Sequence, residues 1–322
     1  MYDFIKANLE VEVFDQVRKL TSELATQKYY PETGSWRSDI LTYKNFTFEN
    51  VLNIHLNWEG SLHKFKNDGK HNYDQFTIQD IKETLSRIEN LFCIDNKKTK
   101  IHNLEFGVNL NVPFEVRRIL DSIIIYKGKD EIKRFNGKGY LIREKHEQYE
   151  IKIYDKGMQY NTGTNILRFE IKVKTMQYLR SKGCDVVYLS DILCPVIQSK
   201  LGIILSKAVN NILVYPLEYD LTYLKRKDIE FFLKGRDKTY WKMIKPSNRK
   251  KKIKRLKEIF KIASTPEFIP LTTELVLKQW KILSGVEVEK VPNFIPSYFT
   301  HSYTSVNRLN RVRFFYDIPV LY

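Results

Sequence analysis

Hydrophobic and polar positions alternate most regularly in two neighbouring stretches near the middle of the chain, 149–156 and 166–174. In the second stretch, charged residues separate the apolar positions Leu167, Phe169, Ile171 and Val173. A period of two predicts β-strands whose successive side chains point to opposite faces. The segment between the two stretches contains Gly157 and Gly163, which indicates a turn. We therefore expect two antiparallel strands with one apolar face and one charged face.

Other segments with clear periodic patterns precede this pair. In 77–92 apolar residues recur at helical spacing behind Thr77, a good N-cap residue, and predict an amphipathic helix that covers one face of the sheet. In 101–113 the alternation predicts a third strand with Glu105, Gly107 and Asn109 on its polar face. Weaker alternation predicts strands in 41–57 and 139–143, and a small β element packed on the main sheet in 1–30.

The pattern changes after residue 215. Helical spacing in 112–125, in a short segment after Lys174 and in 189–214 predicts helices packed on the sheet. The segment from 216 onward instead mixes aromatic residues with dense lysine. The predicted fold class is α+β, with a central antiparallel sheet and packed helices in 1–215. A basic, mostly helical region is predicted in 216–322.

The charge of the chain narrows the choice of partners. Its 322 residues include 54 Lys and Arg against 38 Asp and Glu, which gives a formal net charge of +16. Nucleic acid is the commonest partner of such a protein, and a solvated basic surface is the alternative. The chain has no apolar run of about 18 residues and no signal-peptide core, so we expect a cytoplasmic protein without membrane contact. The three cysteines lack metal-ligand spacing and are expected to be reduced.

The densest basic cluster lies in 242–261, next to Tyr240 and Trp241. A basic helix with adjacent aromatic residues is typical of a DNA-binding element whose cations contact phosphates. An amphipathic helix with a solvated lysine face is the other interpretation. The cations predicted to bind DNA here are Arg249, Lys250, Lys251, Lys252, Lys254 and Arg255.

Three short motifs add a resemblance to a known family. They are GSLHKF with the polar segment that follows it in 60–77, LEFGVN in 104–109, and the pair IYDKGMQ and LRFEIKV in 153–173. In this order they resemble the rolling-circle replication initiators of the gene II type of filamentous phages and the related plasmid Rep proteins. The resemblance covers roughly 60–193. The His-hydrophobe-His metal motif of many proteins with this mechanism is absent, because the stretch from Ile54 to Leu56 supplies one histidine.

This resemblance implies a site-specific endonuclease and strand transferase that acts on single-stranded DNA. A tyrosine nicks one strand, becomes joined to the 5′ phosphate and leaves a 3′-OH that primes replication. The implied partners are single-stranded or duplex origin DNA, a host helicase and a polymerase. A non-catalytic DNA-binding regulator with the same fold is the alternative, and a transposase or relaxase would use the same tyrosine chemistry.

Nicking also needs a divalent cation, and hard oxygen ligands suit Mg²⁺ or Mn²⁺. Glu105, Asn109 and Glu170 can hold that cation if their strands are neighbours, because they then share one face. Asp155 is a further candidate ligand, although strict alternation places it on the core side unless a bulge turns it. Glu170 could instead form an ion pair with a basic residue across the sheet.

The nucleophile predicted from the resemblance is Tyr178, on the short helix that follows the second strand. Tyr160 and Tyr154 are the alternatives. Lys156 lies in phase with Tyr154 and is expected to stabilise charge on the scissile phosphate. Arg168 and Lys172, on the charged face, are expected to bind DNA. The histidines of the 60–77 segment, His63 and His71, could ligate a metal, grip phosphate or form local hydrogen bonds.

Overall fold

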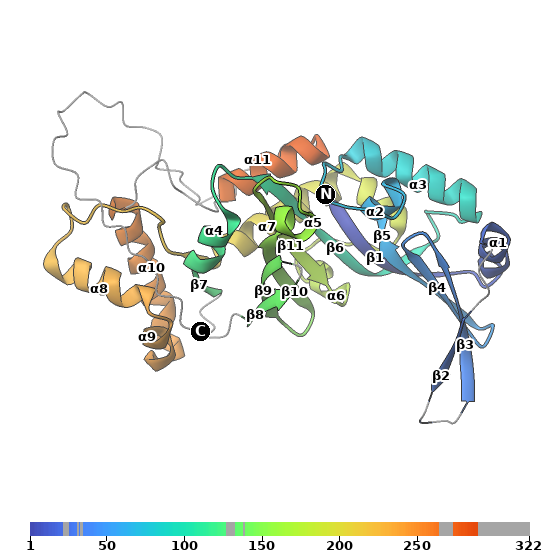
Figure 1. Cartoon of the computed structure of the whole chain (residues 1–322), viewed down its shortest axis with the longest axis horizontal. Coiled ribbons are helices and arrows are strands. Elements are labelled where there is room, and N and C mark those ends of the chain that lie inside the picture. Colours follow the sequence, from blue (N-terminus) through green and yellow to red (C-terminus); the bar gives the residue numbers. More distant parts are fainter. Residues whose placement is uncertain are drawn as a thin grey trace. The chain divides into compact units, whose positions relative to one another are not determined.

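The computed structural model describes residues 1–21, 26–30, 32, 35–126, 133–137, 139–263 and 273–288, and the chain divides into two compact units (Figure 1). Unit 1 comprises Met1–Asp121, Glu131–Asn211 and Leu271–Glu289. Unit 2 comprises Ser122–Asp130, Ile212–Pro270 and Lys290–Tyr322. The assignment of nicking to 1–215 and of DNA binding to 216–322 stays a prediction. Among the described helices none is both long enough and apolar enough to cross a membrane.

Unit 1 is built on a ten-stranded antiparallel sheet with the order β2, β3, β4, β5, β1, β6, β11, β10, β9, β8. The strands are β1 (Tyr2–Leu9), β2 (Thr26–Tyr30), β3 (Ser35–Tyr43), β4 (Phe46–Val51), β5 (His55–Ser61), β6 (Lys100–Asn111), β8 (Lys133–Gly137), β9 (Gly139–Lys145), β10 (Tyr149–Asp155) and β11 (Ile166–Val173). This architecture confirms the predicted α+β class with a central antiparallel sheet. One expectation is wrong: the opening residues do not form a separate β element, because β1 is an inner strand of the main sheet.

The register of the inner strands places the predicted polar positions on one face. In β11, Glu170 lies opposite Gly107 of β6 on one side and opposite Lys152 of β10 on the other. Arg168 lies opposite Asn109 in the same register. Because directly paired residues point to the same side of a sheet, these side chains share one face.

The other face of the sheet is apolar and is covered by helices. They include α3 (Ile78–Phe92), η1 (Leu189–Leu193), α7 (Pro195–Asn210) and α11 (Thr273–Ser284). Figure 1 shows α3 and α11 along one side of the sheet. The Trp280 ring of α11 packs edge-on against Tyr2 and Phe106, and Phe92 of α3 packs against Phe48. Thr77 is the N-cap of α3, as predicted, and it forms a capping box with Asp80.

The shorter helices of unit 1 are α1 (Val13–Leu20), α2 (Leu62–Lys66), α4 (Val116–Ser122), α5 (Lys156–Tyr160) and α6 (Gln177–Arg180). The helix predicted over 112–125 is therefore shorter than expected. Its last residues form β7 (Ile123–Tyr126) instead, which pairs with β12 (Ile212–Val214) in unit 2. A run of three isoleucines favours a strand when such a partner is available.

Unit 2 is mostly helical, as predicted for the C-terminal region. Besides the β7–β12 pair it contains α8 (Arg226–Arg236), α9 (Lys238–Met243) and α10 (Pro246–Ala263). Its core is aromatic and aliphatic, with Phe232, Trp241 and Leu256 almost fully buried. A glycine at 235 lets α8 and α10 approach closely, because a Cβ there would lie 2.4 Å from Leu256.

Candidate active site

Three carboxylates from three adjacent strands meet on the polar face of the unit 1 sheet. Asp3 lies on β1, Glu105 on β6 and Glu170 on β11, and one oxygen from each lies within 4.8 Å of the others. All three residues are buried, with Glu170 only 1% exposed. Buried carboxylates are costly unless they are paired or bind a metal, so this carboxylate cluster (Asp3, Glu105 and Glu170) is the first candidate for a functional site.

Gly107 makes room for the cluster. It lies opposite Glu170 in the β6–β11 pair, between Glu105 and Asn109 in sequence. A Cβ at this position would lie 2.2 Å from the carbonyl oxygen of Phe169 and 2.6 Å from the Cβ of Glu170. Both distances are shorter than atoms can approach, so only glycine allows the two strands to come together here with Glu170 in place.

Basic side chains neutralise the cluster from two sides. The Lys152 ammonium lies 3.0 Å from a Glu105 oxygen and 3.1 Å from a Glu170 oxygen, so that it bridges the two carboxylates. Lys172 lies 3.1 Å from Glu105, and the buried Arg168 donates to Glu170 at 2.8 Å. The alternative that Glu170 pairs with basic neighbours across the sheet is therefore correct for these contacts.

The two glutamates respond to this environment in opposite directions. Burial raises the pKa of Glu105, and the nearby charge of Glu170 raises it further. Burial also opposes ionisation of Glu170, but Lys152 and Arg168 outweigh it and lower the pKa of Glu170 to about 2. Glu170 is thus firmly ionised at neutral pH, and Glu105 takes up a proton more readily than Glu170.

Tyr154 and Lys156 lie beside Glu170. The Tyr154 hydroxyl donates to a Glu170 oxygen at 3.4 Å, and the Lys156 ammonium donates to the Tyr154 hydroxyl at 3.3 Å. Burial raises the pKa of Tyr154 well above its usual value, and the charge of Glu170 adds to the effect. Burial lowers the pKa of Lys156 to about 8, so this lysine can exchange a proton near neutral pH.

Tyr160 reaches the cluster through one asparagine. Its hydroxyl donates to the Asn72 side-chain oxygen at 2.8 Å, and the Asn72 amide donates to an Asp3 oxygen at 2.6 Å. Asp3 also accepts a hydrogen bond from the Ser61 hydroxyl. The Lys156 ammonium lies 5.2 Å from the centre of the Tyr160 ring, within the range of a cation–π contact. Tyr160 is half-buried, whereas the cluster itself is buried.

Two predicted metal ligands point elsewhere. The Asn109 side chain accepts from Arg168 at 3.2 Å and donates to the carbonyl oxygen of Tyr73 at 2.9 Å, so its polar atoms are already engaged. Asp155 lies opposite Leu167, in phase with the core positions, and accepts from the backbone N–H of Met158 as the N-cap of α5. Neither belongs to the group of three carboxylates, and their proposed roles as ligands remain predictions.

Tyr178 lies away from the cluster. Its ring stacks on Tyr149 with centroids 4.2 Å apart, and Tyr149 is paired with Val173 in the apolar phase of the sheet. Tyr178 is therefore on the opposite face from Glu170. It is 7% exposed, and burial raises its pKa well above the usual value. The structure does not bring this tyrosine together with the carboxylates, whereas it brings Tyr154 and Tyr160 close to them.

The histidines of the 60–77 segment serve local structure. His63 is buried, stacks on Phe76 and lies 2.7 Å from a carboxylate oxygen of Asp74. Burial lowers the pKa of His63 to about 4, although Asp74 opposes this shift. His71 stacks on Tyr73 and contacts the Asn67 amide. The alternative of local hydrogen bonding is therefore the one that the contacts of these histidines fit.

The donor set of the cluster suits a hard divalent cation. Three carboxylates supply oxygen ligands of the kind that Mg²⁺ and Mn²⁺ prefer. The space between Glu105 and Glu170 is bridged by the Lys152 ammonium, so a metal bound by both glutamates would have to displace it. The chemistry and position of these residues therefore fit a metal ion, which would compete with the Lys152 ammonium for the two glutamates.

Asp3 is the member of the cluster that sequence reasoning missed. A signal was present: it is the single acidic residue in the strand YDFIKANL, next to Tyr2 and Phe4. A carboxylate in such an apolar strand is expected to find a buried partner. Its partners come from distant segments, however, and the sequence offers no sign that β1 lies beside β6.

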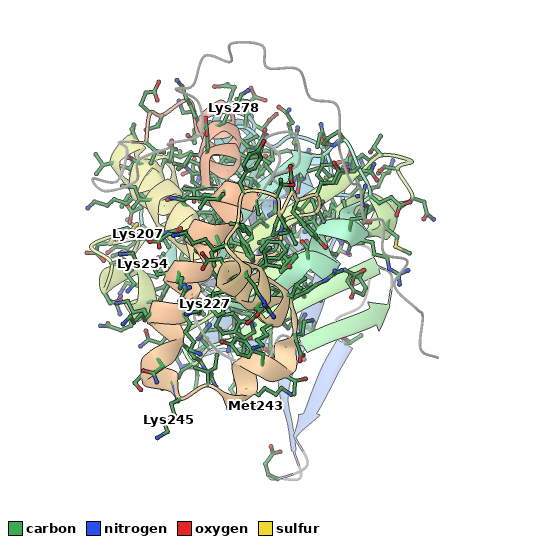
Figure 2. All side chains as sticks on the ribbon, turned by 90° about the vertical axis from the view of Figure 1, so that its left-hand side faces the viewer. Lys207, Lys227, Met243, Lys245, Lys254 and Lys278 are labelled. Atoms are coloured by element: carbon green, nitrogen blue, oxygen red, sulfur yellow. The ribbon has the colours of Figure 1, made fainter. Side chains whose placement is uncertain are left out.

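The basic cluster of unit 2 lies on α10, where the six predicted DNA-binding cations form two groups. Lys250, Lys251 and Lys254 are exposed. Figure 2 labels Lys254 of α10 and Lys227 of α8, which is also exposed. The other three contact neighbouring helices or their caps: Arg249 donates to the carbonyl oxygen of Ile244, Lys252 donates to the Tyr240 hydroxyl, and Arg255, although exposed, forms an ion pair with Asp228.

Of the two cations predicted to bind DNA on the unit 1 sheet, Lys172 is the more accessible. Its side chain is 30% exposed, whereas that of Arg168 is 2% exposed and lies against Glu170 and Asn109. One terminal nitrogen of Arg168 has no hydrogen-bond partner among the described residues. Arg168 therefore acts first as a cation that holds the cluster together.

Comparisons with known proteins find similarity in structure but not in sequence. No protein-family profile matches the chain, and a search of characterised proteins finds no match in sequence. The structure is similar to that of the rolling circle replication initiator protein from Geobacillus stearothermophilus, with a TM-score of 0.35 and 11% identity. The match covers 80% of this chain and 95% of that chain.

Proposed function

We propose that the chain is a metal-assisted tyrosine endonuclease and strand transferase that nicks single-stranded DNA at an origin and initiates rolling-circle replication. One observation carries this proposal: all three motif segments contribute to one site. Asn72 of the 60–77 segment, Glu105 of LEFGVN and Glu170 of LRFEIKV meet at the carboxylate cluster. Lys156 of IYDKGMQ contacts Tyr154 at its edge.

The proposed reaction is a transesterification. A tyrosine oxygen forms a bond to phosphorus, and the bond between that phosphorus and the 3′ oxygen breaks. The tyrosine hydroxyl loses its proton and the 3′ oxygen gains one, so the products are a 5′-phosphotyrosyl ester and a free 3′-OH. The reverse reaction closes the strand after synthesis.

Three parts of the proposed site would assist the reaction: the carboxylate cluster with its cation, Lys156, and the exposed lysines of α10. A divalent cation held by the carboxylate cluster would neutralise the scissile phosphate. Lys156 would stabilise the charge on the same phosphate, and its lowered pKa also suits it to accept the tyrosine proton. The exposed lysines of α10 would hold the duplex part of the origin.

Tyr160 is the nucleophile that we favour over Tyr154 and Tyr178. It is half-buried, so that a phosphate can approach it, and its hydroxyl is oriented through Asn72 toward Asp3. Tyr154 donates to the buried Glu170, which holds its pKa high and suits it to a positioning role. Tyr178, predicted first from the family resemblance, is the remaining alternative.

A second candidate function is a DNA-binding regulator that keeps the fold but does not cut. The observation that favours it is the Lys152 ammonium between Glu105 and Glu170, which balances their charge without a metal. The two functions differ in one measurable respect, because only the endonuclease forms a covalent bond to DNA.

The test is a search for that bond. The full chain is incubated with Mn²⁺ and a 3′-labelled pool of single-stranded DNA that includes the origin of its own genetic element, and adducts are mapped by mass spectrometry. We expect a labelled adduct on one tyrosine peptide, lost with EDTA and with Glu105→Gln. Glu59→Gln is the matched control, since Glu59 is a half-exposed glutamate of the same sheet that lies outside the carboxylate cluster.

The tyrosine variants complete the experiment. Tyr160→Phe is expected to abolish the adduct, while Tyr178→Phe keeps it. An adduct lost only with Tyr178→Phe would move the nucleophile to the other face of the sheet and leave the reaction class intact. Binding of the origin without any adduct would overturn the endonuclease and support the regulator.

A further inference from the structure

A cleft opens in unit 1 at the end of the sheet where β6 begins and β11 ends. Its volume is about 420 Å³. Lys100 and His102 reach it from the start of β6, Lys174 follows the end of β11, and Arg180 comes from α6. Buried apolar side chains, among them Met176 and Val186, form part of its wall. The cleft therefore combines a basic rim with an apolar wall.

The charge of this cleft is unbalanced, unlike that of the carboxylate cluster. Its lining contains four basic side chains and no acidic one among the described residues. Two of the four are held in place by neutral groups: Lys174 donates to the carbonyl oxygen of His146, and Arg180 donates to the Gln177 side chain. A neutral acceptor orients a cation and leaves its charge available to an anion.

The pKa of His102, the histidine of the cleft, is affected by nearby positive charges. The pKa of His102 is lowered by burial first, and then by the nearby charges of Lys100 and Lys6. Positive charges that gather around one hollow repel each other, and a bound anion would relieve that repulsion. The apolar wall at the same place suits the sugar or base of a nucleotide, which a simple inorganic anion does not require.

The cleft also lies in line with the carboxylate cluster. Lys172 lies in β11 in the phase of Glu170 and contacts Glu105 directly, and Lys174 follows it by two residues, just past the end of the strand. Lys174 comes four positions after Glu170, a distance of roughly 13 Å for an extended chain. A single strand of DNA with one phosphate at the cluster can therefore reach the cleft with a phosphate a few nucleotides away.

We propose that this cleft, lined by Lys100, His102, Lys174 and Arg180, binds the phosphate backbone of single-stranded DNA beside the carboxylate cluster. This inference rests on the proposed function for the identity of the ligand. The phosphate could belong to a strand or to a mononucleotide, which present the same chemistry to the rim. The position of the cleft along β11 favours a strand that extends from the nicking site.

The test compares charge reversals inside and outside the cleft. The double variant Lys100→Glu and Arg180→Glu changes two rim residues that are exposed and distant from the carboxylate cluster in the strand register. The matched control applies the same change to Lys97 and Lys82, two exposed lysines that do not line the cleft. Binding of fluorescein-labelled dT12 is measured by anisotropy over a range of salt, with dTMP titrated in parallel.

The expected result is a loss of affinity for dT12 confined to the cleft variant. We expect roughly tenfold weaker binding at moderate salt, and a slope of log K against log salt that is shallower by about 1.4, because two phosphate contacts are lost. The control variant is expected to retain the parent slope within about 0.5. Equal losses of dT12 affinity in both variants would contradict the proposed binding role of the cleft, because the effect would then come from net charge.

Two further outcomes separate this inference from the proposed function. If dTMP binds as tightly as dT12 and the cleft variant abolishes both, the cleft is a mononucleotide site and the strand path is wrong. Suppose that the parent chain forms a tyrosine adduct and the cleft variant still binds dT12 like the parent. The proposed DNA-binding role of the cleft is then wrong, whereas the proposed endonuclease activity is supported. If the parent chain forms no adduct and the cleft variant loses dT12 binding, the DNA-binding role of the cleft is supported and the proposed endonuclease activity is contradicted.

Discussion

The carboxylate cluster of unit 1 and the α10 surface of unit 2 use charge in opposite ways. In the cluster the charged groups are buried and each contacts a partner, as between Lys152 and the two glutamates. On α10 the outward lysines Lys250, Lys251 and Lys254 are exposed. Buried charges depend on every neighbour, whereas exposed charges act almost independently. We therefore expect single changes to be severe in the cluster and mild on α10.

The sharpest test of this contrast is removal of Glu170. Glu170→Ala removes the carboxylate to which the buried Arg168 donates and leaves Lys152 with Glu105 alone, so we expect the free energy of unfolding to fall by about 3–5 kcal/mol. The measurement is urea unfolding monitored by tryptophan fluorescence. Glu59→Ala, which removes a half-exposed partner of Lys6, should cost less than about 1 kcal/mol. Equal effects of the two changes would contradict the contrast.

The second test fills the space beside Glu170. Gly107→Ala introduces a Cβ that collides with the β11 backbone, and we expect it to lower the free energy of unfolding by about 1–3 kcal/mol. Asn57→Ala on β5 changes a half-buried residue of the same sheet without adding atoms and should stay within about 0.5 kcal/mol. If Gly107→Ala unfolds like the parent chain, the close approach of β6 and β11 is not needed.

The third test uses pH and concerns Lys156. Its folded-state pKa of about 8 lies below the usual lysine value of 10.5, so between these values the unfolded chain binds more protons. Stability is therefore expected to rise with pH across this window, by about 1.4 kcal/mol per pH unit from this residue. Lys156→Met should remove that part of the rise between pH 8.5 and 9.5. The same pH dependence in both proteins would show that Lys156 is not the group responsible.

The smallest effects on stability are expected on α10. Replacing Lys250, Lys251 and Lys254 by alanine should leave the free energy of unfolding within about 0.5 kcal/mol, because these side chains are exposed. Affinity for duplex DNA should nevertheless fall, with a salt slope shallower by about 2.7 for three lost phosphate contacts. Anisotropy with a labelled origin duplex measures this slope.

A matched change on the same helix separates binding from folding. Lys252→Ala removes the hydrogen bond to the Tyr240 hydroxyl, and we expect it to cost about 1 kcal/mol of stability. Its effect on the salt slope should be smaller than that of an outward lysine. A larger loss of DNA affinity from Lys252→Ala than from Lys254→Ala would place the binding surface on the other side of α10.

Local patterns predicted much of the fold because the sheet is regular. The strict alternation in β10 and β11 predicted their bounds within one residue, and the N-cap residue Thr77 marked the start of α3. The same alternation placed Glu105, Asn109 and Glu170 on one face, since β6 and β11 are neighbours. It also put Asp155 on the core side, where the structure has it.

The parts of the site that the sequence did not predict depend on pairing between distant segments. Asp3 joins the cluster only because β1 lies between β5 and β6, and no local pattern encodes that order. Tyr178 was linked to the site by the family resemblance, which implies a tyrosine on a helix beside the sheet. Its stacking partner Tyr149 shows on which face of the sheet Tyr178 lies. Tyr149 is an odd number of residues from Lys152 in β10, so it points to the face opposite Glu170.

The inner position of β1 also has a consequence for the order in which the molecule becomes active. This strand pairs Lys6 with Glu59 on one side and with Asn103 on the other, so its second partner lies far away in sequence. Contacts of such long range form slowly during folding, because a large loop must close first. The helices of α8 to α10 are local by comparison and can form early. A partly folded chain would bind DNA through α10 before the carboxylate cluster has assembled. The order of folding would therefore delay the proposed cleavage of DNA until after the proposed DNA binding.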